Sequence, residues 1–250
     1  MLLKDKTVLV VGASTGMGRR TAIYAGEQGA KLIVAARRKD ECDKIIDAHK
    51  AAGGDGLALH MDGTDEASVN DGIAQVAETY GTLDCVFNNI GNTQGFGPFI
   101  ETPLERWQAS MDVNVTSVFM LMRAQIPLMQ KNGGGVIVNN SSTAGLQGVP
   151  TMADYCASKW GLIGLTYTVA KEYGPENIRC LAIAPGVIMT ERAQEMESKM
   201  PQIFDNIRKD IPLGHTGDMQ DIAELVCWLM SDKAKYVTGI TVPIDGGRTA

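Results

Sequence analysis

Histidine and cysteine are scarce in this chain, and their spacing excludes the common metal and disulfide frameworks. The 250 residues include 3 histidines and 5 cysteines, and none of them falls in a CxxC, HxxxH or HExxH pattern. A metal site is therefore not expected. The cysteines are odd in number and scattered, which is typical of a chain that works in a reducing cytoplasm. Cys156 adjoins Tyr155, but neighbouring helical positions face different directions, so we interpret it as an unreactive thiol rather than a nucleophile.

Basic clusters and long apolar runs are also missing. The net charge is -6 and no block of lysine and arginine stands out, so the chain lacks the electrostatic pattern of a nucleic-acid-binding protein. No apolar run approaches the roughly 18 residues that span a bilayer. The amino terminus enters an apolar strand directly, without room for a signal sequence. We therefore expect small-molecule ligands, no nucleic-acid partner and no membrane segment.

The pattern of apolar residues predicts an α/β fold. Short β-rich runs alternate with longer amphipathic stretches, which is typical of parallel strands joined by crossover helices. No linker or repeat marks a domain boundary, so we predict one domain over residues 1–250. The expected architecture is a doubly wound, Rossmann-type, seven-stranded parallel sheet with helices on both faces. The expected strands are Thr7–Val11, Lys31–Ala36, Gly56–His60, Cys85–Asn88, Gly135–Asn139, Arg179–Ala184 and Thr241–Ile244, and examples of helical patterns are Gly18–Gln28, Ala67–Tyr80, Pro103–Gln130, Asp154–Tyr173 and Asp218–Met230.

The segment from Val187 to Pro212 departs from this alternation. It carries three methionines, Phe204 and many charged residues. This mixture favours a mobile flap with an apolar inner face at about residues 187–212. A helix packed permanently on the core would show the same pattern.

A cluster of glycines follows the first expected strand. Gly12, Gly16 and Gly18 form a GxxxGxG motif that opens the first expected helix. Glycine permits a tight turn and a close approach of the backbone to a ligand, and a helix N-terminus offers N–H groups and partial positive charge to a pyrophosphate. Glycines at such turns are also common for structural reasons. The placement of the motif in a βαβ unit is what favours dinucleotide binding.

Tyr155 and Lys159 lie four residues apart in an expected helix, thirteen residues after Ser142. An i, i+4 pair shares one helix face, so the ammonium can lie beside the phenol. A free phenol has a pKa of about 10, and a neighbouring positive charge lowers that pKa. We therefore predict a tyrosine that can exchange protons with an alcohol or a ketone.

Taken together, these motifs resemble the short-chain dehydrogenase/reductase family from one end of the chain to the other. GxxxGxG is the glycine spacing of that family, and Asn88-Asn89-Ile90-Gly91 is similar to its NNAG signature. Val11 stands where the family usually has threonine, and Ile90 is bulkier than the family's alanine. The further matching positions, in family order, are Asp62, Asn114, Ser142, Tyr155 with Lys159, Pro185-Gly186 and Thr190.

The resemblance implies an oxidoreductase in which four residues carry the chemistry. Tyr155 is the expected general acid/base, and Ser142 is expected to hydrogen-bond the developing oxyanion. Lys159 is expected to hold the ribose hydroxyls and to lower the pKa of the phenol, and Asn114 to support a water that links Lys159 to solvent. Each residue taken alone has a structural explanation, such as a strand end for Ser142. The joint spacing with the glycine motif favours the catalytic interpretation.

The resemblance also implies a set of residues that bind the nicotinamide cofactor. Asp62 is expected to meet the adenine amine, and its structural alternative is a strand-end cap. The full expected set is Gly12, Ser14, Thr15, Gly16, Met17, Gly18, Arg37, Arg38, Asp62, Gly63, Asn89, Gly91, Tyr155, Lys159, Pro185, Gly186, Ile188 and Thr190.

The end of the second expected strand bears on the choice between the two nicotinamide cofactors. NAD-selective sites place an acid there for the ribose 2′-hydroxyl, whereas an arginine accommodates a 2′-phosphate. Ala36 occupies the position of that acid, and no acid precedes Asp40. We predict NADP(H), with Arg37 as the main contact and Arg38 as the secondary one. The alternative is two solvated surface arginines.

The positions that the resemblance places beside the substrate are mostly apolar. No lysine or arginine is expected among them, so we predict a neutral, fairly hydrophobic ketone or secondary alcohol. Core packing is the alternative role for the methionines. These positions are Gln94, Phe96, Ala144, Gln147, Met152, Val187 and Met189.

Other functions share these motifs. An NAD-dependent alcohol dehydrogenase of the same family, a non-catalytic dinucleotide sensor, and an epimerase or dehydratase with a tightly held cofactor are the alternatives. A sensor needs no proton donor, and a separate substrate domain is not expected here, so the simple reductase is favoured. The family usually forms tetramers through the helices around residues 104–130 and 154–173 and the last strand. A homotetramer is therefore expected, although burial within one protomer explains the same apolar pattern.

Overall fold

A seven-stranded sheet forms the centre of the protein. The computed structural model describes all 250 residues. Every pair of neighbouring strands is parallel, and the order across the sheet is β3-β2-β1-β4-β5-β6-β7. The strands are β1 (Thr7–Val11), β2 (Lys31–Ala36), β3 (Gly56–His60), β4 (Cys85–Asn88), β5 (Gly135–Asn140), β6 (Ile178–Pro185) and β7 (Thr241–Ile244).

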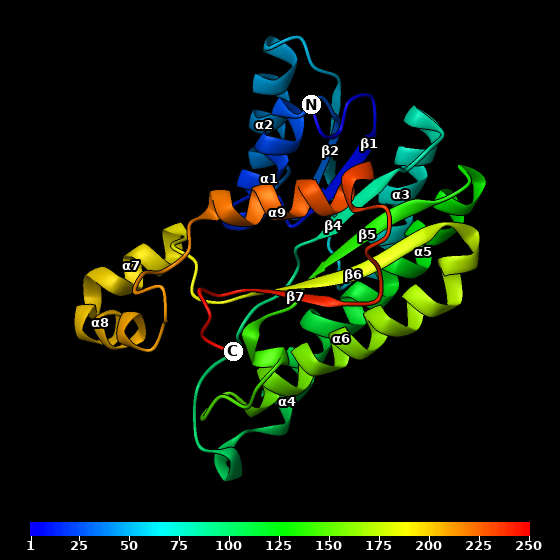
Figure 1. Cartoon of the computed structure of the whole chain (residues 1–250). Helices are drawn as coiled ribbons and strands as arrows, with labels where there is room; N and C mark the ends of the chain where they lie inside the picture. Colours follow the sequence, from blue (N-terminus) through cyan, green and yellow to red (C-terminus); the bar gives the residue numbers. More distant parts are fainter.

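Helices cover both faces of the sheet (Figure 1). One face carries α1 (Gly16–Glu27), α2 (Lys39–Ala51) and α9 (Met219–Met230), and the other carries α3 (Glu66–Tyr80), α5 (Ser117–Lys131) and α6 (Ala153–Tyr173). Each face has its own hydrophobic core, because successive side chains of a strand point to opposite sides. Val8 and Val10 of β1 join the first core, and Leu9 and Val11 join the second. The predicted doubly wound fold is confirmed.

The strand order places a crevice at one edge of the sheet. From β1 the chain winds outward to β3, and from β4 it winds in the opposite direction to β7. In open parallel sheets of this kind, ligands bind outside the carboxyl ends of the strands at the point where the winding direction changes. That point here lies between β1 and β4.

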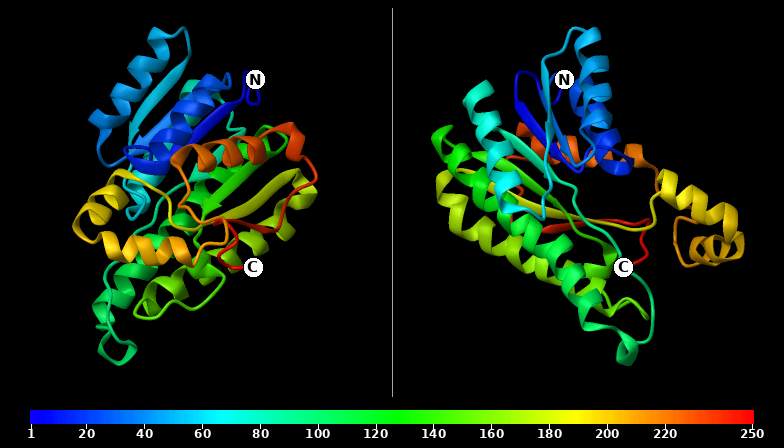
Figure 2. Two further views of the ribbon diagram at one scale, coloured as in Figure 1. Left: turned by 60° about the vertical axis from the view of Figure 1, so that its left-hand side comes forward. Right: turned by 180° about the vertical axis from the view of Figure 1, so that it is seen from behind.

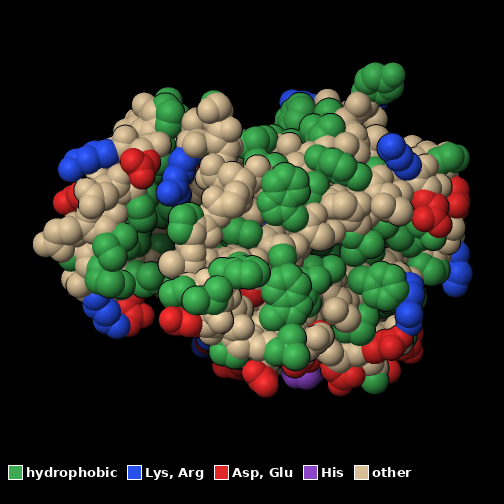
Figure 3. All heavy atoms as spheres, turned by 90° about the horizontal axis from the view of Figure 1, so that it is seen from below, with side chains coloured by type: hydrophobic (Ala, Val, Ile, Leu, Met, Phe, Trp, Pro, Cys, Tyr) green, Lys and Arg blue, Asp and Glu red, His purple; other side chains and the backbone are tan.

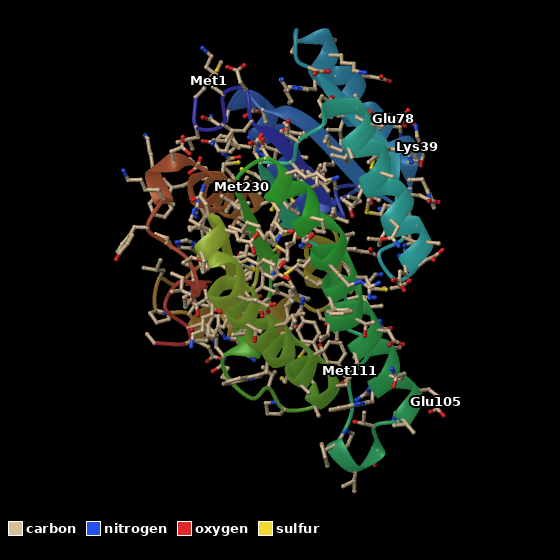
Figure 4. The ribbon with its side chains drawn as sticks, turned by 90° about the vertical axis from the view of Figure 1, so that its right-hand side faces the viewer. Met1, Lys39, Glu78, Glu105, Met111 and Met230 are labelled. Atoms are coloured by element: carbon tan, nitrogen blue, oxygen red, sulfur yellow. The ribbon has the colours of Figure 1, made fainter.

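The helix predicted from Pro103 to Gln130 is interrupted. It consists of α4 (Leu104–Met111), a π-helical segment η2 (Asp112–Thr116) and then α5. Figure 4 shows α4 and α5 as one nearly continuous rod, with Met111 at the junction and Glu105 pointing outward. π-Helical turns inside longer helices are frequent at functional sites, and this one contains Asn114.

Residues 187–212 contain two short helices beyond the carboxyl ends of the strands (Figures 1 and 2). They are α7 (Glu191–Lys199) and α8 (Pro201–Lys209). No residue of α7 is buried, whereas Phe204 of α8 and Ile211 after it are 5% and 3% exposed. Within residues 187–212, Ile188, Phe204 and Ile211 are therefore the buried side chains that anchor the segment.

Four short 3₁₀ turns complete the chain. They are η1 (Phe99–Glu101), η3 (Thr143–Gly145), η4 (Gly174–Glu176) and η5 (Asp232–Ala234). The turn η3 directly follows Ser142, which begins it as N-cap residue. No helix combines the length and the apolar content needed to cross a bilayer.

Candidate active site

A cleft of about 840 Å³ opens at the carboxyl ends of β1, β2, β3 and β4. It joins the glycine loop, the end of β2 and the segment that follows β4, which are far apart in the sequence. Most of the predicted cofactor residues before position 92 line it. The lining residues are Gly12, Ser14, Thr15, Ala36, Arg37, Arg38, Met61, Asp62, Gly63, Thr64, Asn89, Ile90, Gly91, Asn92, Gln94 and Val113.

The glycine loop approaches its neighbours too closely for side chains. Gly12 has a φ of +80°, in the left-handed region. A Cβ atom at Gly18 would lie 2.3 Å from the carbonyl oxygen of Gly12. No side chain caps α1 at Thr15, and no acidic residue lies in its first turn. The first N–H groups of α1 and its partial positive charge are thus left for an anionic ligand, and this part of the cleft fits a dinucleotide pyrophosphate.

Two arginines lie at the end of β2. The Nη2 atom of Arg38 donates to Ser14 Oγ at 3.1 Å and to Thr15 Oγ1 at 3.4 Å. Arg37 lies close enough to Asp62 to contribute to the lowered pKa of that carboxyl group. Both arginines are exposed and carry no carboxylate salt bridge, while Ala36 is 6% exposed. This corner of the cleft is positively charged and lacks an acid at the position of Ala36.

Asp62 caps the end of β3 and also lines the cleft. Its Oδ1 accepts the backbone N–H of Thr64 at 3.0 Å and the Thr64 hydroxyl at 2.7 Å. These hydrogen bonds, with the Thr64 backbone contributing most, hold the pKa of Asp62 below its ordinary value. The residue therefore closes a turn after β3 and also presents a half-buried carboxylate to the cleft.

The larger side chain at Ile90 is accommodated by a glycine. A Cβ atom at Gly63 would lie 2.2 Å from Ile90 Cδ1. The isoleucine therefore fills space beside Gly63 and packs against the core of the α3, α5 and α6 face. Its extra bulk relative to alanine is taken up at the floor of the cleft.

A chain of hydrogen bonds links the glycine loop to Lys159. The amide of Asn89 donates to the carbonyl oxygen of Gly12 at 3.1 Å, and Asn89 Oδ1 accepts from the amide of Asn140 at 2.8 Å. The Nζ of Lys159 then donates to the carbonyl oxygen of Asn140 at 2.8 Å. Asn140 was not among the predicted site residues, because its contacts cross neighbouring strands and leave no sequence motif.

Asn114 lies in the π-helical segment with its side chain fully hydrogen-bonded. Its Oδ1 accepts the N–H of Asn92 at 3.0 Å, and its Nδ2 donates to the carbonyl oxygens of Asn92 and Ser110, each at 3.0 Å. A Cβ atom at Gly91 would lie 2.7 Å from Lys159 Nζ and 2.9 Å from Asn114 Oδ1. Gly91 thus lies directly between the asparagine and the lysine.

Tyr155, Lys159 and Ser142 meet at the start of α6. The Nζ of Lys159 lies 5.7 Å from the centroid of the Tyr155 ring. Lys159 is 2% exposed, and burial lowers its pKa to about 7. Burial also raises the pKa of Tyr155, and a hydrogen bond with Ser142 opposes that rise.

The expectation that the lysine lowers the pKa of the phenol is therefore wrong for the ligand-free protein. Removal of both groups from water disfavours the phenolate and the ammonium alike. A lysine with a pKa of about 7 carries only part of its charge at neutral pH, so its effect on Tyr155 is reduced. The two side chains lie together as predicted, whereas the pKa of Tyr155 is shifted in the opposite direction to the prediction.

The predicted residues after β6 have mixed positions. Thr190 caps α7 through a hydrogen bond from the N–H of Ala193 at 3.3 Å, and a Cβ atom at Gly16 would lie 3.5 Å from Thr190 Cγ2. Thr190 thus lies next to the glycine loop. Pro185 and Gly186 end and follow β6. In contrast, the side chain of Ile188 packs into the core of the α1, α2 and α9 face, so this side chain does not face a ligand in the cleft.

The side chain of Met17, like that of Ile188, packs against the core of the α1, α2 and α9 face rather than facing the cleft.

An additional basic residue lies at the site and was missed by the sequence analysis. Arg192 of α7 donates from Nη1 to Asn92 Oδ1 at 3.1 Å, and Asn92 is the residue that holds Asn114. The contact spans a hundred residues and has no local signal in the sequence.

The predicted substrate positions differ widely in exposure. Gln94 lines the cleft, Phe96 is 62% exposed and Ala144 is 3% exposed. Gln147, Met152, Val187 and Met189 are half-buried. Elsewhere, no group of three or more histidine, cysteine, aspartate or glutamate side chains could hold a metal ion.

Known proteins resemble the chain over nearly its whole length. The family model described as "Enoyl-(Acyl carrier protein) reductase" matches residues 12–249. A 3-oxoacyl-(acyl-carrier-protein) reductase of Thermotoga maritima is 34% identical, over 99% of this chain and 99% of that protein. A 2,5-dichloro-2,5-cyclohexadiene-1,4-diol dehydrogenase of Sphingobium indicum is 36% identical, over 99% of this chain and 98% of that protein. The solved structure of a 7α-hydroxysteroid dehydrogenase, complexed with NADH and 7-oxo glycochenodeoxycholic acid, has a TM-score of 0.92 at 31% identity, over 98% of this chain and 94% of that one.

Proposed function

The chain belongs to the short-chain dehydrogenase/reductase family, and from this premise we propose that it uses NADP(H) to interconvert a neutral, fairly hydrophobic ketone and the corresponding secondary alcohol. Tyr155 is the proposed general acid/base. The observation that carries the proposal is the convergence of Tyr155, Lys159, Ser142 and Asn114, with Lys159 and Asn114 beside Gly91, which lines the cleft.

The proposed mechanism assigns the proton transfer to this chain's own side chains. The bound nicotinamide supplies or accepts the hydride. In reduction, the Tyr155 hydroxyl donates a proton to the carbonyl oxygen, and in oxidation the phenolate takes the hydroxyl proton. The raised pKa of Tyr155 keeps the phenol protonated at neutral pH in the ligand-free protein. The protonated phenol is the form that donates to a carbonyl oxygen.

Ser142 and Lys159 both lie where they can hydrogen-bond a ligand beside Tyr155. Ser142 Oγ accepts the N–H of Ala144 at 3.1 Å and its hydroxyl hydrogen-bonds Tyr155, so a substrate oxygen beside the phenol can take over that hydroxyl's donor as an oxyanion develops. Lys159 donates to Asn140 and has further N–H groups to offer to ribose hydroxyls. Asn114 holds Asn92 and Ser110, and we assign to it the support of the water that connects Lys159 with solvent.

The preference for NADP(H) is supported by the charge at the end of β2. Arg38 beside Ser14 and Arg37 beside Asp62 offer guanidinium groups, and Ala36 offers no acid to a ribose 2′-hydroxyl. NAD(H) is the alternative, because the related 7α-hydroxysteroid dehydrogenase was solved with NADH. The remaining positions proposed for the cofactor are those named from the sequence, with Ile188 and Met17 acting through their backbones.

We predict that NADPH binds more tightly than NADH, and that this difference depends on the two arginines. A hydrogen bond to a charged group contributes about 1.5–3 kcal/mol, so Arg37→Ala and Arg38→Ala should each weaken NADPH binding by about tenfold or more. Fluorescence titration of wild type and variants with both cofactors measures this. NADH binding should stay unchanged in the variants, and equal or tighter binding of NADH by the wild type contradicts the prediction.

The substrate class is supported by the apolar positions Phe96, Met152, Val187 and Met189 and by the relatives. Two of the relatives named above are dehydrogenases of cyclic alcohols by their names. The test is a spectrophotometric screen at about 340 nm, the nicotinamide absorbance, with NADPH and NADH against ketones, alcohols, sugars and steroids. Turnover confined to neutral ketones or secondary alcohols is expected, and turnover only of charged substrates contradicts the proposal.

Domain organisation, cellular location and oligomeric state also belong to the proposal. We infer one domain over residues 1–250, with residues 187–212 acting as a flap, since only Phe204 and Ile211 anchor α8 and the segment after it. We also infer a cytoplasmic homotetramer, supported by five unpaired buried cysteines and by exposed aromatic side chains on α5 and α6. A non-catalytic sensor is disfavoured because all four catalytic positions are filled.

A further inference from the structure

A buried ion pair lies directly beside the proposed acid/base residue. Asp154, which precedes Tyr155 in the first turn of α6, is 0% exposed. Its Oδ1 lies 3.4 Å from Nη2 of Arg106 on α4, and the Arg106 side chain is only 14% exposed. The hydroxyl of Ser110, also fully buried, donates to Asp154 Oδ2 at 2.5 Å. We refer to these three residues as the 106/110/154 cluster.

The cluster connects the two elements that carry Tyr155 and Asn114. The side chain of Ser110 holds Asp154, one residue before Tyr155, while its carbonyl oxygen accepts from Asn114 Nδ2 at 3.0 Å. One serine therefore contacts both the start of α6 and the asparagine of the π-helical segment. A displacement of Ser110 would move these two elements relative to each other.

The cluster also reaches the segment that carries two proposed substrate-facing residues. Nη2 of Arg106 donates to Thr102 Oγ1 at 2.8 Å. Cβ atoms at Gly95 and Gly97 would lie 3.3 Å from Arg106 Cδ and 3.4 Å from Arg106 Nη1. The N–H of Gly97 in turn donates to the carbonyl oxygen of Thr151, just before α6, at 3.0 Å. Residues 94–102 are thus held between α4 and the start of α6.

Stability alone is a weak explanation for such a pair. The cost of removing two charges from water often exceeds their attraction, and apolar replacement of both partners is frequently neutral or stabilising. The pair is also imperfectly satisfied, since Arg106 Nε and Asp154 Oδ1 have no hydrogen-bond partner. Its directional contacts instead fix the relative placement of three segments around the site.

We propose that Arg106, Ser110 and Asp154 are positioning residues, which hold Tyr155 and Asn114 in register with the substrate-facing segment 94–102. This inference rests on the proposed function of the site. Their side chains contact one another and Thr102, and the carbonyl oxygen of Ser110 holds Asn114, so they act through Tyr155, Asn114 and the segment.

The decisive variant is the double substitution Arg106→Met/Asp154→Asn. It removes both charges, keeps the aliphatic stem at position 106 and leaves an amide oxygen for Ser110, so neither charge is left buried and unpaired. Ser110→Ala tests the bridge separately. The matched control is Lys6→Met/Asp232→Asn, which removes the 3.0 Å ion pair at the amino end of β1, where Asp232 is 88% exposed.

For the double variant we expect kcat to fall by between about tenfold and a hundredfold, the range that a misplacement of about 1 Å can produce. Cofactor affinity and thermal stability should stay near wild type. The primary isotope effect with NADPH deuterated at the transferred position should rise, because misalignment slows the hydride and proton step itself. A smaller folded fraction would lower activity without changing that isotope effect. The control variant should match wild type in all four measurements.

Amide hydrogen exchange supplies a readout that does not require turnover. Exchange of residues 94–102 and of the first turn of α6 should be faster in the double variant and in Ser110→Ala than in wild type. Unchanged exchange there, or wild-type kcat in a stable double variant, overturns the positioning role. Absence of wild-type turnover across the substrate panel would instead refute the proposed function, and the exchange result would still decide whether the cluster fixes these segments.

Discussion

At the scale of single residues, burial sets the protonation of the site more strongly than the lysine–tyrosine pairing does. Burial lowers the pKa of Lys159 to about 7 and raises the pKa of Tyr155. The spacing of the two residues was evident in the sequence, because four positions in a helix place them on one face. Their exposure depends on strands and loops that are distant in sequence. The direction of the two pKa shifts could therefore not be read from the motif.

The buried ammonium predicts a specific pH dependence of stability. The folded-state pKa of Lys159 is about 7, below its ordinary value of 10.5. Between these values the unfolded chain binds more protons than the folded one, so stability rises with pH, with a slope of at most about 1.4 kcal/mol per pH unit. Lys159→Met lacks this contribution. Thermal unfolding of both ligand-free proteins is measured at about pH 6 and pH 9. The stability of the wild type relative to the variant should be higher at the higher pH, and a difference that does not change with pH contradicts the prediction.

The candidate site could be predicted from the sequence where residues lie in short motifs. Gly12, Gly18 and Asp62 lie in or beside the cleft, and Ser142, Asn114 and Lys159 surround Tyr155 or Gly91 as expected. Their catalytic and binding roles stay predictions. Asn140, Arg192 and the 106/110/154 cluster were missed, because each acts through a contact between separate elements. The side chain of Ile188 lies in the core, so its predicted contact with the cofactor would have to come from its backbone.

At the scale of elements, periodicity predicted the strands well and the helices less completely. β5 extends one residue beyond its expected end, and β6 extends one residue beyond each of its expected ends. α2 was not among the helical patterns named as examples, and only Cys42, Ile45 and Ile46 of its 13 residues are buried. The π-helical segment was not predicted either. The π-helical segment shifts the register of the helix without changing its apolar character. The sequence pattern across Asn114 therefore predicts one continuous helix.

The flap leads to a prediction about local stability. If residues 187–212 open as a unit, Phe204→Ala should loosen α8 while leaving the sheet intact, because Phe204 is the one buried residue of that helix. Segments that open locally do so with a free energy far below that of global unfolding. We expect faster amide exchange over residues 187–212, a higher KM and a nearly unchanged melting temperature. A large drop in melting temperature, of the size produced by core truncations of about 3–5 kcal/mol, would show a permanently packed helix instead.

At the scale of the whole molecule, one face carries a concentration of exposed hydrophobic side chains. Figure 3 shows these side chains gathered on the face seen from below. Phe119 of α5 is 43% exposed, and Trp160 and Tyr167 of α6 are 52% and 36% exposed. Contiguous apolar surface of this kind marks interaction sites in soluble proteins. Each of these helices buries one side on the sheet and exposes aromatic side chains on the other, so burial within the protomer explains one side and the tetramer interface stays a prediction for the other.

A single charge on this face should therefore disrupt assembly. We predict that the wild type sediments as a tetramer in analytical ultracentrifugation, and that Phe119→Glu sediments as a smaller species with an unchanged circular dichroism spectrum. Burial of an unpaired carboxylate in an interface is strongly unfavourable. A monomeric wild type, or a variant that remains tetrameric, contradicts the prediction.

The overall architecture was the part of the molecule most accessible from the sequence. Alternating strand and helix patterns predicted the seven parallel strands, and the switch in winding direction between β1 and β4 explains why the glycine loop and Gly91 share one cleft. Substrate identity was the least accessible part. Its proposed positions come from separate loops, and they range from the 62% exposed Phe96 to the nearly buried Ala144.

The central claim is that the hydroxyl of Tyr155 transfers the proton to or from the substrate oxygen. The most direct test is kcat of Tyr155→Phe with the best substrate from the screen, beside wild type and Tyr236→Phe, which alters a fully exposed tyrosine far from the cleft residues. The account predicts a fall of about a hundredfold or more in Tyr155→Phe, the scale of a lost general acid, with cofactor affinity retained. Turnover close to that of wild type would contradict it.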